Sequence, residues 1–356
     1  LTLARGGGGE AAAPRGRDAP VRIGLSLVPL LEARWQADRD LFVRRAGELG
    51  ATVAVQSANG DDATQVRDVQ SLLTAGVDVL VIVPHDGLAM AKGVELANRA
   101  GVPVIAYDRL IRDCDLDLYL SFDNVKVGAL QARYLVDHLP TPGRGKIVRI
   151  YGAPTDNNAR LFKQGQDQVL LPLIESGAIE VVHEDWAEDW KPENAKRIVN
   201  AALSRGVLFE GVLASNDGTA GGAVQALLEE GLAGKVVVTG QDAELAALQR
   251  IAAGTQAMTV YKPLSVLATT AADLAVALGR GRPVVARDTV DNGRRAVPSV
   301  LCDIVAVDAG NLVATVIADG FHDYDSVYAA VPAQRRPPRP AAAPSPAPAP
   351  APAPAP

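Results

Sequence analysis

Seven short groups of polar and aromatic residues each stand where an apolar, strand-like segment ends. They are Arg34-Trp35, Asp108-Arg109, Asp156-Asn157-Asn158, Trp190, Asn216-Asp217, Gln241-Asp242 and Lys262. Guanidinium, carboxylate and amide groups supply hydrogen-bond donors and acceptors, and an indole supplies a flat apolar face. A small polyhydroxylated ring requires this combination. Because ligands of open α/β sheets bind beyond the carboxyl ends of the strands, we predict that the seven groups converge on one pocket.

Asp108-Arg109 is the sharpest of these groups. A carboxylate beside a guanidinium can present acceptors and a rigid donor fork to adjacent hydroxyls of one ring. The alternative is an ion pair that only caps the loop after residues 104 to 107. Arg34-Trp35 has a similar alternative, since such a pair also occurs at an ordinary helix start.

The acidic and amide groups later in the chain are open to two interpretations. Asp156, Asn158 and Asn216 follow strand-like segments and could be helix N-caps, which Asp and Asn favour, or could point into the pocket. Recurrence at a third strand end, at Asp242, favours the pocket. Lys262 could hold a ring hydroxyl or could anchor a hinge through an ion pair.

Two tryptophans compete for the role of apolar wall. Trp186 and Trp190 lie in one loop of a chain with only 4% aromatic residues. An indole face suits the C–H face of a pyranose. We expect Trp190 to provide that face and Trp186 to be structural.

Enzyme motifs are missing from the sequence. It contains no Gly-Lys-Ser/Thr phosphate loop, no Gly-x-Ser-x-Gly elbow and no His-Glu-x-x-His. Its four histidines are scattered singly. Asp61-Asp62, Asp108 and Asp242 could be set against each other as the acid and nucleophile of a glycosidase, but no spacing demands it. We therefore expect no catalytic residue, no cofactor and no metal site.

The composition bounds the class of protein. A chain of 356 residues suits two lobes, and a formal net charge of -6 gives no reason to expect a nucleic acid as partner. Cys114 and Cys302 are too few for a disulfide scaffold or a cysteine-based zinc site, and their pairing with each other stays open. No segment approaches the roughly 20 apolar residues that span a bilayer.

The order of the elements indicates the fold. Between residues 22 and 318, β-branched segments alternate with amphipathic helical segments, which is the pattern of βαβ units with parallel sheets. The scheme begins afresh after residue 122. We predict an α/β fold of two similar lobes, each a parallel sheet flanked by helices. Extended segments near residues 120, 260 and 302 predict three hinge crossings, the last within one long strand over residues 299 to 307.

These crossings set the expected lobe boundaries. The first lobe comprises residues 21–121 and 263–300, and the second comprises residues 122–262 and 301–330. Residues 1–20 are rich in glycine and are expected to be a flexible leader. Residues 331–356, where proline comes to alternate with alanine, are expected to be a disordered tail.

Eight segments together carry a family resemblance. They are Arg34-Trp35-Gln36, Gln56-Ser57-Ala58-Asn59-Gly60, Ala106-Tyr107-Asp108-Arg109, Ser121-Phe122-Asp123-Asn124, Asp156-Asn157-Asn158-Ala159, Ala214-Ser215-Asn216-Asp217, Gly240-Gln241-Asp242-Ala243 and Thr259-Val260-Tyr261-Lys262-Pro263. With them, the chain from Val21 to about Tyr324 closely resembles the bacterial periplasmic D-xylose-binding proteins. These are soluble receptors of sugar ABC transporters, of the type I periplasmic-binding-protein superfamily. The chain departs from these proteins in three features. Val28-Pro29 stands in place of a pair of aspartates, and the two cysteines and the proline-rich tail are unusual for the family.

The resemblance implies a set of ligand contacts and a function. The contacts are Arg34, Trp35, Asp108, Arg109, Asp156, Asn158, Trp190, Asn216, Asp242 and Lys262, with Trp35 stacking on the ring. The implied function is that of an exported solute-binding protein, which captures a monosaccharide, above all D-xylose, and delivers it to a membrane permease. The resemblance also implies a monomer in the periplasm or at the cell surface, with or without a lipid anchor.

Three alternatives remain at this point. A receptor for a different monosaccharide needs only one altered loop. A sugar-processing enzyme could share the same polar residues. A repressor sensor core can share the fold, but residues 1–20 are too short for the helix-turn-helix that it needs.

Overall fold

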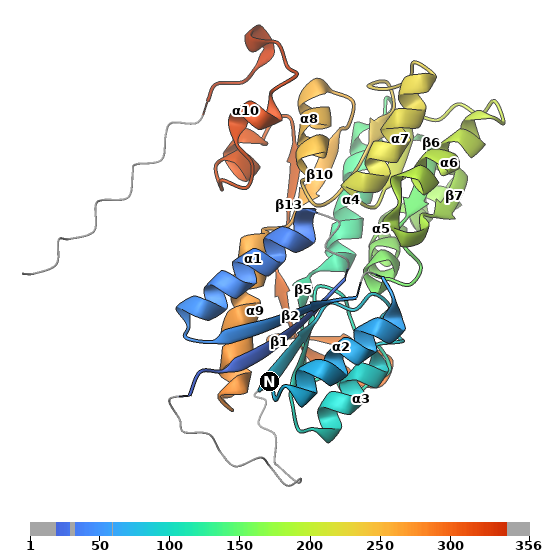
Figure 1. Ribbon diagram of the computed structural model, residues 1–356. Helices are drawn as coiled ribbons and strands as arrows, with labels where there is room; N and C mark the ends of the chain where they lie inside the picture. The colour runs from blue at the N-terminus through green and yellow to red at the C-terminus, as the bar shows by residue number, and fades with distance from the viewer. Residues whose placement is uncertain (1–18, 29–32, 59, 340–356) are drawn as a thin grey trace, which may run out of the picture.

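The computed structural model describes residues 19–28, 33–58 and 60–339. Their helices and strands form two lobes (Figure 1). The first lobe is built on a seven-stranded sheet with the order β11-β12-β5-β4-β3-β1-β2. Its strands are β1 (Arg22–Leu27), β2 (Thr52–Ser57), β3 (Val79–Ile82), β4 (Val104–Tyr107), β5 (Leu118–Phe122), β11 (Asp288–Asp291) and β12 (Ala296–Cys302). Neighbouring strands are parallel except β11 and β12.

Helices cover both faces of this first sheet. Helices α1 (Ala33–Glu48) and α9 (Leu264–Gly279) pack on one face, and α2 (Asp62–Thr74) and α3 (Ala91–Arg99) pack on the other. Every residue of β3 and β4 is buried. Strands covered on both faces need continuous apolar residues rather than alternating ones, which explains these sequences. Each fully buried valine, leucine or isoleucine contributes about 1.5–3 kcal/mol to folding.

The second lobe repeats this plan on a four-stranded parallel sheet with the order β7-β6-β8-β9. Its strands are β6 (Gly145–Tyr151), β7 (Ile179–Trp186), β8 (Gly211–Ala214) and β9 (Val237–Val238). Helices α4 (Asn124–His138) and α5 (Asn157–Glu175) lie on one face, and α6 (Pro192–Leu203) and α7 (Asp217–Glu229) lie on the other. Helix α8 (Leu245–Ala253) and the antiparallel pair β10 (Met258–Tyr261) and β13 (Val305–Asp308) complete the lobe, together with α10 (Tyr324–Val327).

The fold class expected from the sequence is confirmed, with one correction in its last strand. The chain crosses between the lobes after β5, after β10 and between β12 and β13. The single strand expected over residues 299–307 is wrong, because Asp303 and Ile304 separate two strands that belong to different sheets. Strand β11 was not expected at all, since its residues are polar and mostly exposed.

The strand ends differ slightly from the expected lobe boundaries. Strand β5 continues to Phe122 and β12 continues to Cys302, so both run past the boundaries at residues 121 and 300. Both thiols are free, and Cys114 is buried whereas Cys302 is half-buried. Burial raises the pKa of Cys114 to about 12 and that of Cys302 to about 11.

The disordered tail expected from residue 331 onward is wrong for residues 331–339. The Val331 side chain is buried in a cluster with α8 and α10. Tyr324 Oη donates to the carbonyl oxygen of Pro337 at 2.5 Å, and Arg336 Nε donates to that of Val331 at 2.7 Å. The rest of the expected tail, nearly all of the expected leader, Pro29 and Asn59 lie outside the described residues.

Two glycines let α4 and α5 pack against each other at very short range. A Cβ atom at Gly128 would lie 1.9 Å from the carbonyl oxygen of Phe162, and one at Gly165 would lie 1.9 Å from that of Val125. Any larger side chain would push the helices apart. Helix α5 carries Asn158 and Phe162, so this contact also fixes where those two side chains lie.

We predict that Gly165→Ala lowers the free energy of unfolding by about 1–3 kcal/mol, which is the usual effect of overpacking a tight contact. Denaturant titration followed by circular dichroism measures the loss. Gly47→Ala is the matched control, because Gly47 is exposed near the end of α1 with no atom within 4 Å of an added Cβ. Alanine there should be neutral or stabilising by up to about 1 kcal/mol. Unchanged stability of Gly165→Ala would contradict the close helix contact.

Candidate functional site

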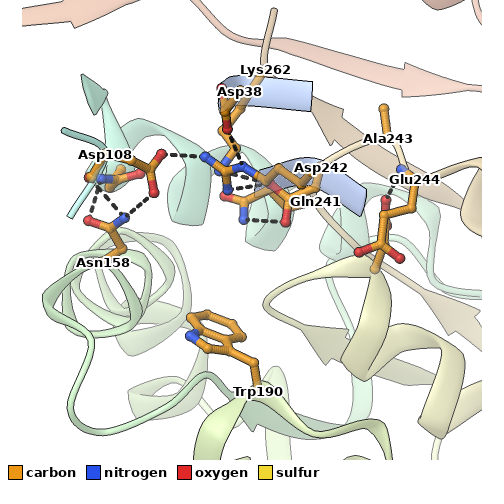
Figure 2. A network of polar contacts seen from close by, with 12 residues as sticks. Asp38, Asp108, Asn158, Trp190, Gln241, Asp242, Ala243, Glu244 and Lys262 are labelled. Atoms are coloured by element: carbon orange, nitrogen blue, oxygen red, sulfur yellow. Dashed lines mark hydrogen bonds and ion pairs between the residues drawn. The ribbon is translucent and has the colours of Figure 1, made fainter. Parts of the chain in front are cut away.

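A pocket of about 340 Å³ of empty space, including its opening, lies between the two lobes. It is lined by Arg34, Trp35, Asp108, Arg109, Asp156, Asn158, Phe162, Trp190, Asn216, Gln241, Asp242 and Lys262. All ten residues expected to contact a ligand are therefore brought together. Figure 2 shows the polar network along one side of this space and the indole of Trp190 facing it.

The first lobe contributes side chains from the start of α1 and from the end of β4. Arg34 and Trp35 lie in the first turn of α1, and Asp108 follows β4 directly. Asp108 has a φ of 61°, a left-handed conformation that is uncommon for a residue with a side chain. Tyr119 Oη and Ser121 Oγ donate to its carbonyl oxygen at 3.0 and 2.7 Å and hold this backbone in place.

Asp156 performs both of the roles that the sequence left open. One carboxylate oxygen accepts from the backbone N–H of Asn158 at 2.9 Å and caps α5. The other accepts from Trp190 Nε1 and pairs with Arg109 Nε, each at 3.1 Å. The carboxylate thus joins the loop after β4 to the second lobe. Asn158 adds a second link, since its Nδ2 donates to the carbonyl oxygen of Asp108 at 3.1 Å.

Asn216 and Asp217, which follow β8, have different roles. Asn216 caps α7 in a reciprocal capping box with Thr219, and it also lines the pocket. Asp217 is fully buried, and its carboxylate accepts from Gln256 Nε2 and Thr259 Oγ1, each at 2.8 Å. Burial raises the pKa of Asp217 well above its usual value, and the nearby charge of Glu244 adds to the effect. Asp217 therefore does not point into the pocket but links the start of α7 to Gln256 and to Thr259 of β10.

The end of β10 and the loop after β9 meet at Asp242. Its Oδ1 lies 2.8 Å from Lys262 Nζ and 3.3 Å from Arg34 Nη1. Asp242 also has a left-handed backbone, with a φ of 99°. Lys262 therefore makes the expected ion pair while its side chain lines the pocket, and Arg34 links α1 of the first lobe to a carboxylate of the second.

The charges of the pocket balance. Three cations, Arg34, Arg109 and Lys262, face three carboxylates, Asp108, Asp156 and Asp242. Burial alone would raise the pKa of Asp108, but attraction to Arg34, Lys262 and Arg109 holds it below the usual carboxyl value. Burial likewise opposes ionisation of Asp242, and Lys262 and Arg34 hold its pKa low. A neutral ligand rich in hydroxyl groups suits such a site, because the lining side chains carry no net charge that a charged ligand would have to balance.

Aromatic side chains form the apolar walls. Trp35 is buried, and the guanidinium carbons of Arg34 and Arg109 lie 4.5 and 5.5 Å from its ring centroid. Trp190 packs edge-on against Phe162, with 6.3 Å between ring centroids. Its ring lies directly over Gly152, where an added Cβ would be 1.9 Å from the indole.

Trp186 is the structural tryptophan of the pair, as expected. Its ring packs at 5.0 Å from that of Tyr151, and the Arg160 guanidinium lies 5.8 Å from its centroid. It does not line the pocket between the lobes as far as the described residues show.

Two lining residues were absent from the expected ligand set. Phe162 lies one helical turn after Asn158 on α5, so the i, i+4 spacing of a helix could have identified it. Gln241 follows a predicted strand, and its Nε2 lies 3.5 Å from Asp242 Oδ2. Its position beside a lining carboxylate was the available signal.

We predict that Lys262→Met lowers the free energy of unfolding by about 3 kcal/mol at pH 7, because it leaves a buried carboxylate with one partner fewer. The depressed pKa of Asp242 contributes stability that is present above the usual carboxyl pKa and lost as the pH falls through the lowered value. The deficit of the variant should therefore shrink in acid. Denaturant titrations at pH 7 and below pH 4 measure it.

Lys196→Met is the matched control for this variant. Lys196 pairs with Glu229 at 2.6 Å on the surface, where the carboxylate side chain is 52% exposed. Such pairs contribute about 0–1 kcal/mol. An equal loss of unfolding free energy in Lys262→Met and Lys196→Met would contradict the prediction that the buried pair of Lys262 and Asp242 stabilises the fold more than a surface pair.

Comparison with known proteins identifies the family. The family model described as periplasmic binding protein domain matches residues 23–283. The D-xylose-binding periplasmic protein of Escherichia coli (strain K12) is 50% identical over 303 residues, which is 85% of this chain and 91% of that protein. The protein of the same name from Haemophilus influenzae is 48% identical over 309 residues, 86% of this chain and 92% of its own.

Solved structures agree with these relatives. A carbohydrate transporter solute binding protein from Chloroflexus aurantiacus, in complex with D-glucose, matches with a TM-score of 0.80 and 34% identity. The match covers 86% of this chain and 98% of that one. The resemblance expected from the sequence is confirmed, and the chain belongs to the family of periplasmic binding proteins.

Proposed function

We propose that this protein is the exported solute-binding component of a sugar ABC transporter and that it captures D-xylose between its lobes. The observation that carries the proposal is the pocket, in which three cations and three carboxylates from both lobes surround a space with aromatic walls. The names of the two relatives at 50% and 48% identity support D-xylose as the sugar. Both names describe binding proteins, and the proposal includes no enzymatic activity.

The side chains of the pocket match the demands of a pyranose. Each sugar hydroxyl can donate to a carboxylate and accept from a cation, and such charge-assisted hydrogen bonds are stronger than neutral ones. Trp35 and Trp190 offer faces for the C–H groups of the ring. A micromolar dissociation constant corresponds to about 8 kcal/mol, which several such bonds and one stacked ring can supply.

Selectivity follows from burial in the same site. A hydroxyl turned to its epimeric position leaves a carboxylate or a guanidinium unpaired, and an unpaired buried polar group costs about 1–3 kcal/mol or more. A site built this way rejects analogues that lack a partner for each group. We therefore propose that epimers of xylose bind more weakly than xylose itself.

The proposal includes a cycle of opening and closing. The two lobes rotate about the three crossings, close on the sugar and present it to a membrane permease. We propose a monomer that works in the periplasm or at the cell surface, with or without a lipid anchor, and that has no nucleic acid partner. None of the described helices is long and apolar enough to cross a bilayer.

A different monosaccharide is the second candidate. It rests on the Chloroflexus aurantiacus protein, which is 34% identical to this chain and whose solved structure holds D-glucose. The hydroxymethyl group of a hexose would need space that a pentose leaves empty. Binding measurements with both sugars separate the two candidates.

The direct test is isothermal titration of the purified protein with D-xylose, ribose, arabinose, galactose and glucose. We expect D-xylose to bind most tightly. Asp108→Ala and Arg109→Ala should each weaken xylose binding by at least about 2 kcal/mol, since each leaves a buried partner unpaired. Circular dichroism should show that both variants remain folded.

A surface pair provides the control for these variants. Asp115 and Arg294 form an exposed ion pair at 2.9 Å, and neither side chain lines the pocket. Arg294→Ala should leave the affinity unchanged. Unchanged affinity in Asp108→Ala and Arg109→Ala as well, or tighter binding of glucose than of xylose, would overturn the assignment.

Gly152→Ala tests the position of the tryptophan wall. The added methyl group would occupy the space of the Trp190 indole, so the ring must move. We expect xylose affinity to fall at least tenfold, about 1.4 kcal/mol, with a change in tryptophan fluorescence. Gly218→Ala is the control, because its added Cβ meets its nearest atom at 3.6 Å, which is ordinary contact. Equal affinities for the two variants would exclude Trp190 as a wall of the sugar site.

A further inference from the structure

Asp38 is a buried carboxylate that touches the pocket only through another side chain. It lies on α1, one turn after Arg34, and is 1% exposed. Tyr107 Oη donates to its Oδ1 at 2.6 Å, while its Oδ2 lies 3.5 Å from Arg34 Nε. Figure 2 shows Asp38 beside the network that joins Asp108 to Asp242, on the side away from Trp190.

Arg34 is the centre of this arrangement. Its guanidinium presents a different nitrogen to each of three carboxylates: Nη2 to Asp108 at 2.5 Å, Nη1 to Asp242 at 3.3 Å and Nε to Asp38. The group is planar and rigid, so an interaction at Nε also affects where both terminal nitrogens point. Asp38 contacts the guanidinium at Nε, whereas the other two carboxylates, those of Asp108 and Asp242, line the pocket.

The contact between Asp38 and Arg34 is an ion pair without a hydrogen bond. Neither Arg34 Nε nor Asp38 Oδ2 has a hydrogen-bond partner among the described residues. Among the described residues, the hydrogen bond that fixes the carboxylate comes from Tyr107, on β4 of the same lobe. Asp38 therefore acts on Arg34 through its charge, in addition to the hydrogen bonds that Arg34 donates to Asp108 and Asp242.

Several charged groups face Asp38 from the surrounding elements. Burial raises the pKa of Asp38 to about 6, against the attraction of Arg34 and the hydrogen bond from Tyr107. Asp108 adds to the increase, and Lys262 opposes it. Arg39, the next residue on α1, lines the same small cavity as Asp38 and Tyr107. Asp108 and Asp242 have lowered pKa values, so they stay ionised while Asp38 gains a proton.

We propose that Asp38 is a positioning residue for sugar binding, whose negative charge aims Arg34 into the pocket, so that a proton on Asp38 weakens binding. This inference rests on the proposed function of the pocket. It adds control of sugar binding by pH through a side chain that does not itself line the pocket. By linkage, binding that favours the ionised carboxylate releases protons when the sugar enters.

Isothermal titration with D-xylose between pH 5 and pH 8 tests this role. In the unaltered protein, we expect affinity to fall about 3- to 5-fold from pH 7 to pH 5, the size of one weakened ion pair. Asp38→Asn should bind at the weaker level throughout, with no change over this range. Titrations at pH 6 in buffers of different ionisation enthalpy should show proton release in the unaltered protein and none in the variant.

Tyr107→Phe provides a second, independent variant that keeps the carboxylate. Without the donor from Tyr107, the pKa of Asp38 rises, so the midpoint of the affinity profile should move to higher pH. If Asp38 had a purely structural role, both substitutions would lower the stability of the protein. The dependence of affinity on pH would then be the same in both variants as in the unaltered protein.

The outcomes separate this inference from the proposed function. If the unaltered protein binds none of the tested sugars, the function itself is wrong. If it binds xylose and Asp38→Asn retains the same affinity and the same pH profile, the positioning role is wrong. If Asp38→Asn does not fold, an unshifted midpoint in Tyr107→Phe overturns the role in its place.

Discussion

A buried charge that has lost its water must find a partner in the protein, and this requirement governs the cleft between the lobes. The cations Arg34, Arg109 and Lys262 and the carboxylates that face them lie in one small space. Removing an ion from water costs several kcal/mol, which only close pairs and hydrogen bonds offset. Arg34 pairs across the cleft with Asp242, and Arg109 pairs with Asp156. The fit of one lobe to the other is thus set by charge pairing as much as by shape.

The backbone of the pocket is strained at several of the residues that line it. Three lining residues, Asp108, Trp190 and Asp242, have left-handed backbone conformations. Conformations of this kind cost on the order of 1–3 kcal/mol and persist only where the surroundings hold them. Hydrogen bonds to the carbonyl oxygen of Asp108 and the ion pairs of Asp242 supply that hold. All three of these strained residues line the pocket, so the strain is concentrated at the candidate site.

Sequence reasoning reached the strand ends because their physics is local and repetitive. A buried parallel strand is a short apolar run, and the polar residue after it, such as Asp108 or Asp242, stands out. Asp38 gave no such signal, since an aspartate in a charged helical segment is usually on the surface, and only packing buries it. The break between β12 and β13 was also hidden, because both strands look alike and differ only in the sheet that they join.

The same atoms serve stability and recognition. Asp156 caps α5 and pairs with Arg109, and Asn216 caps α7 while it lines the pocket. Cap residues are placed by the helix itself, because their oxygens must meet the free N–H groups of the first turn. A pocket built at helix starts therefore inherits its geometry from secondary structure and needs few additional constraints. The cost is that such residues cannot be exchanged freely to accept a new ligand, since a change to a side chain without a capping oxygen also removes a helix cap.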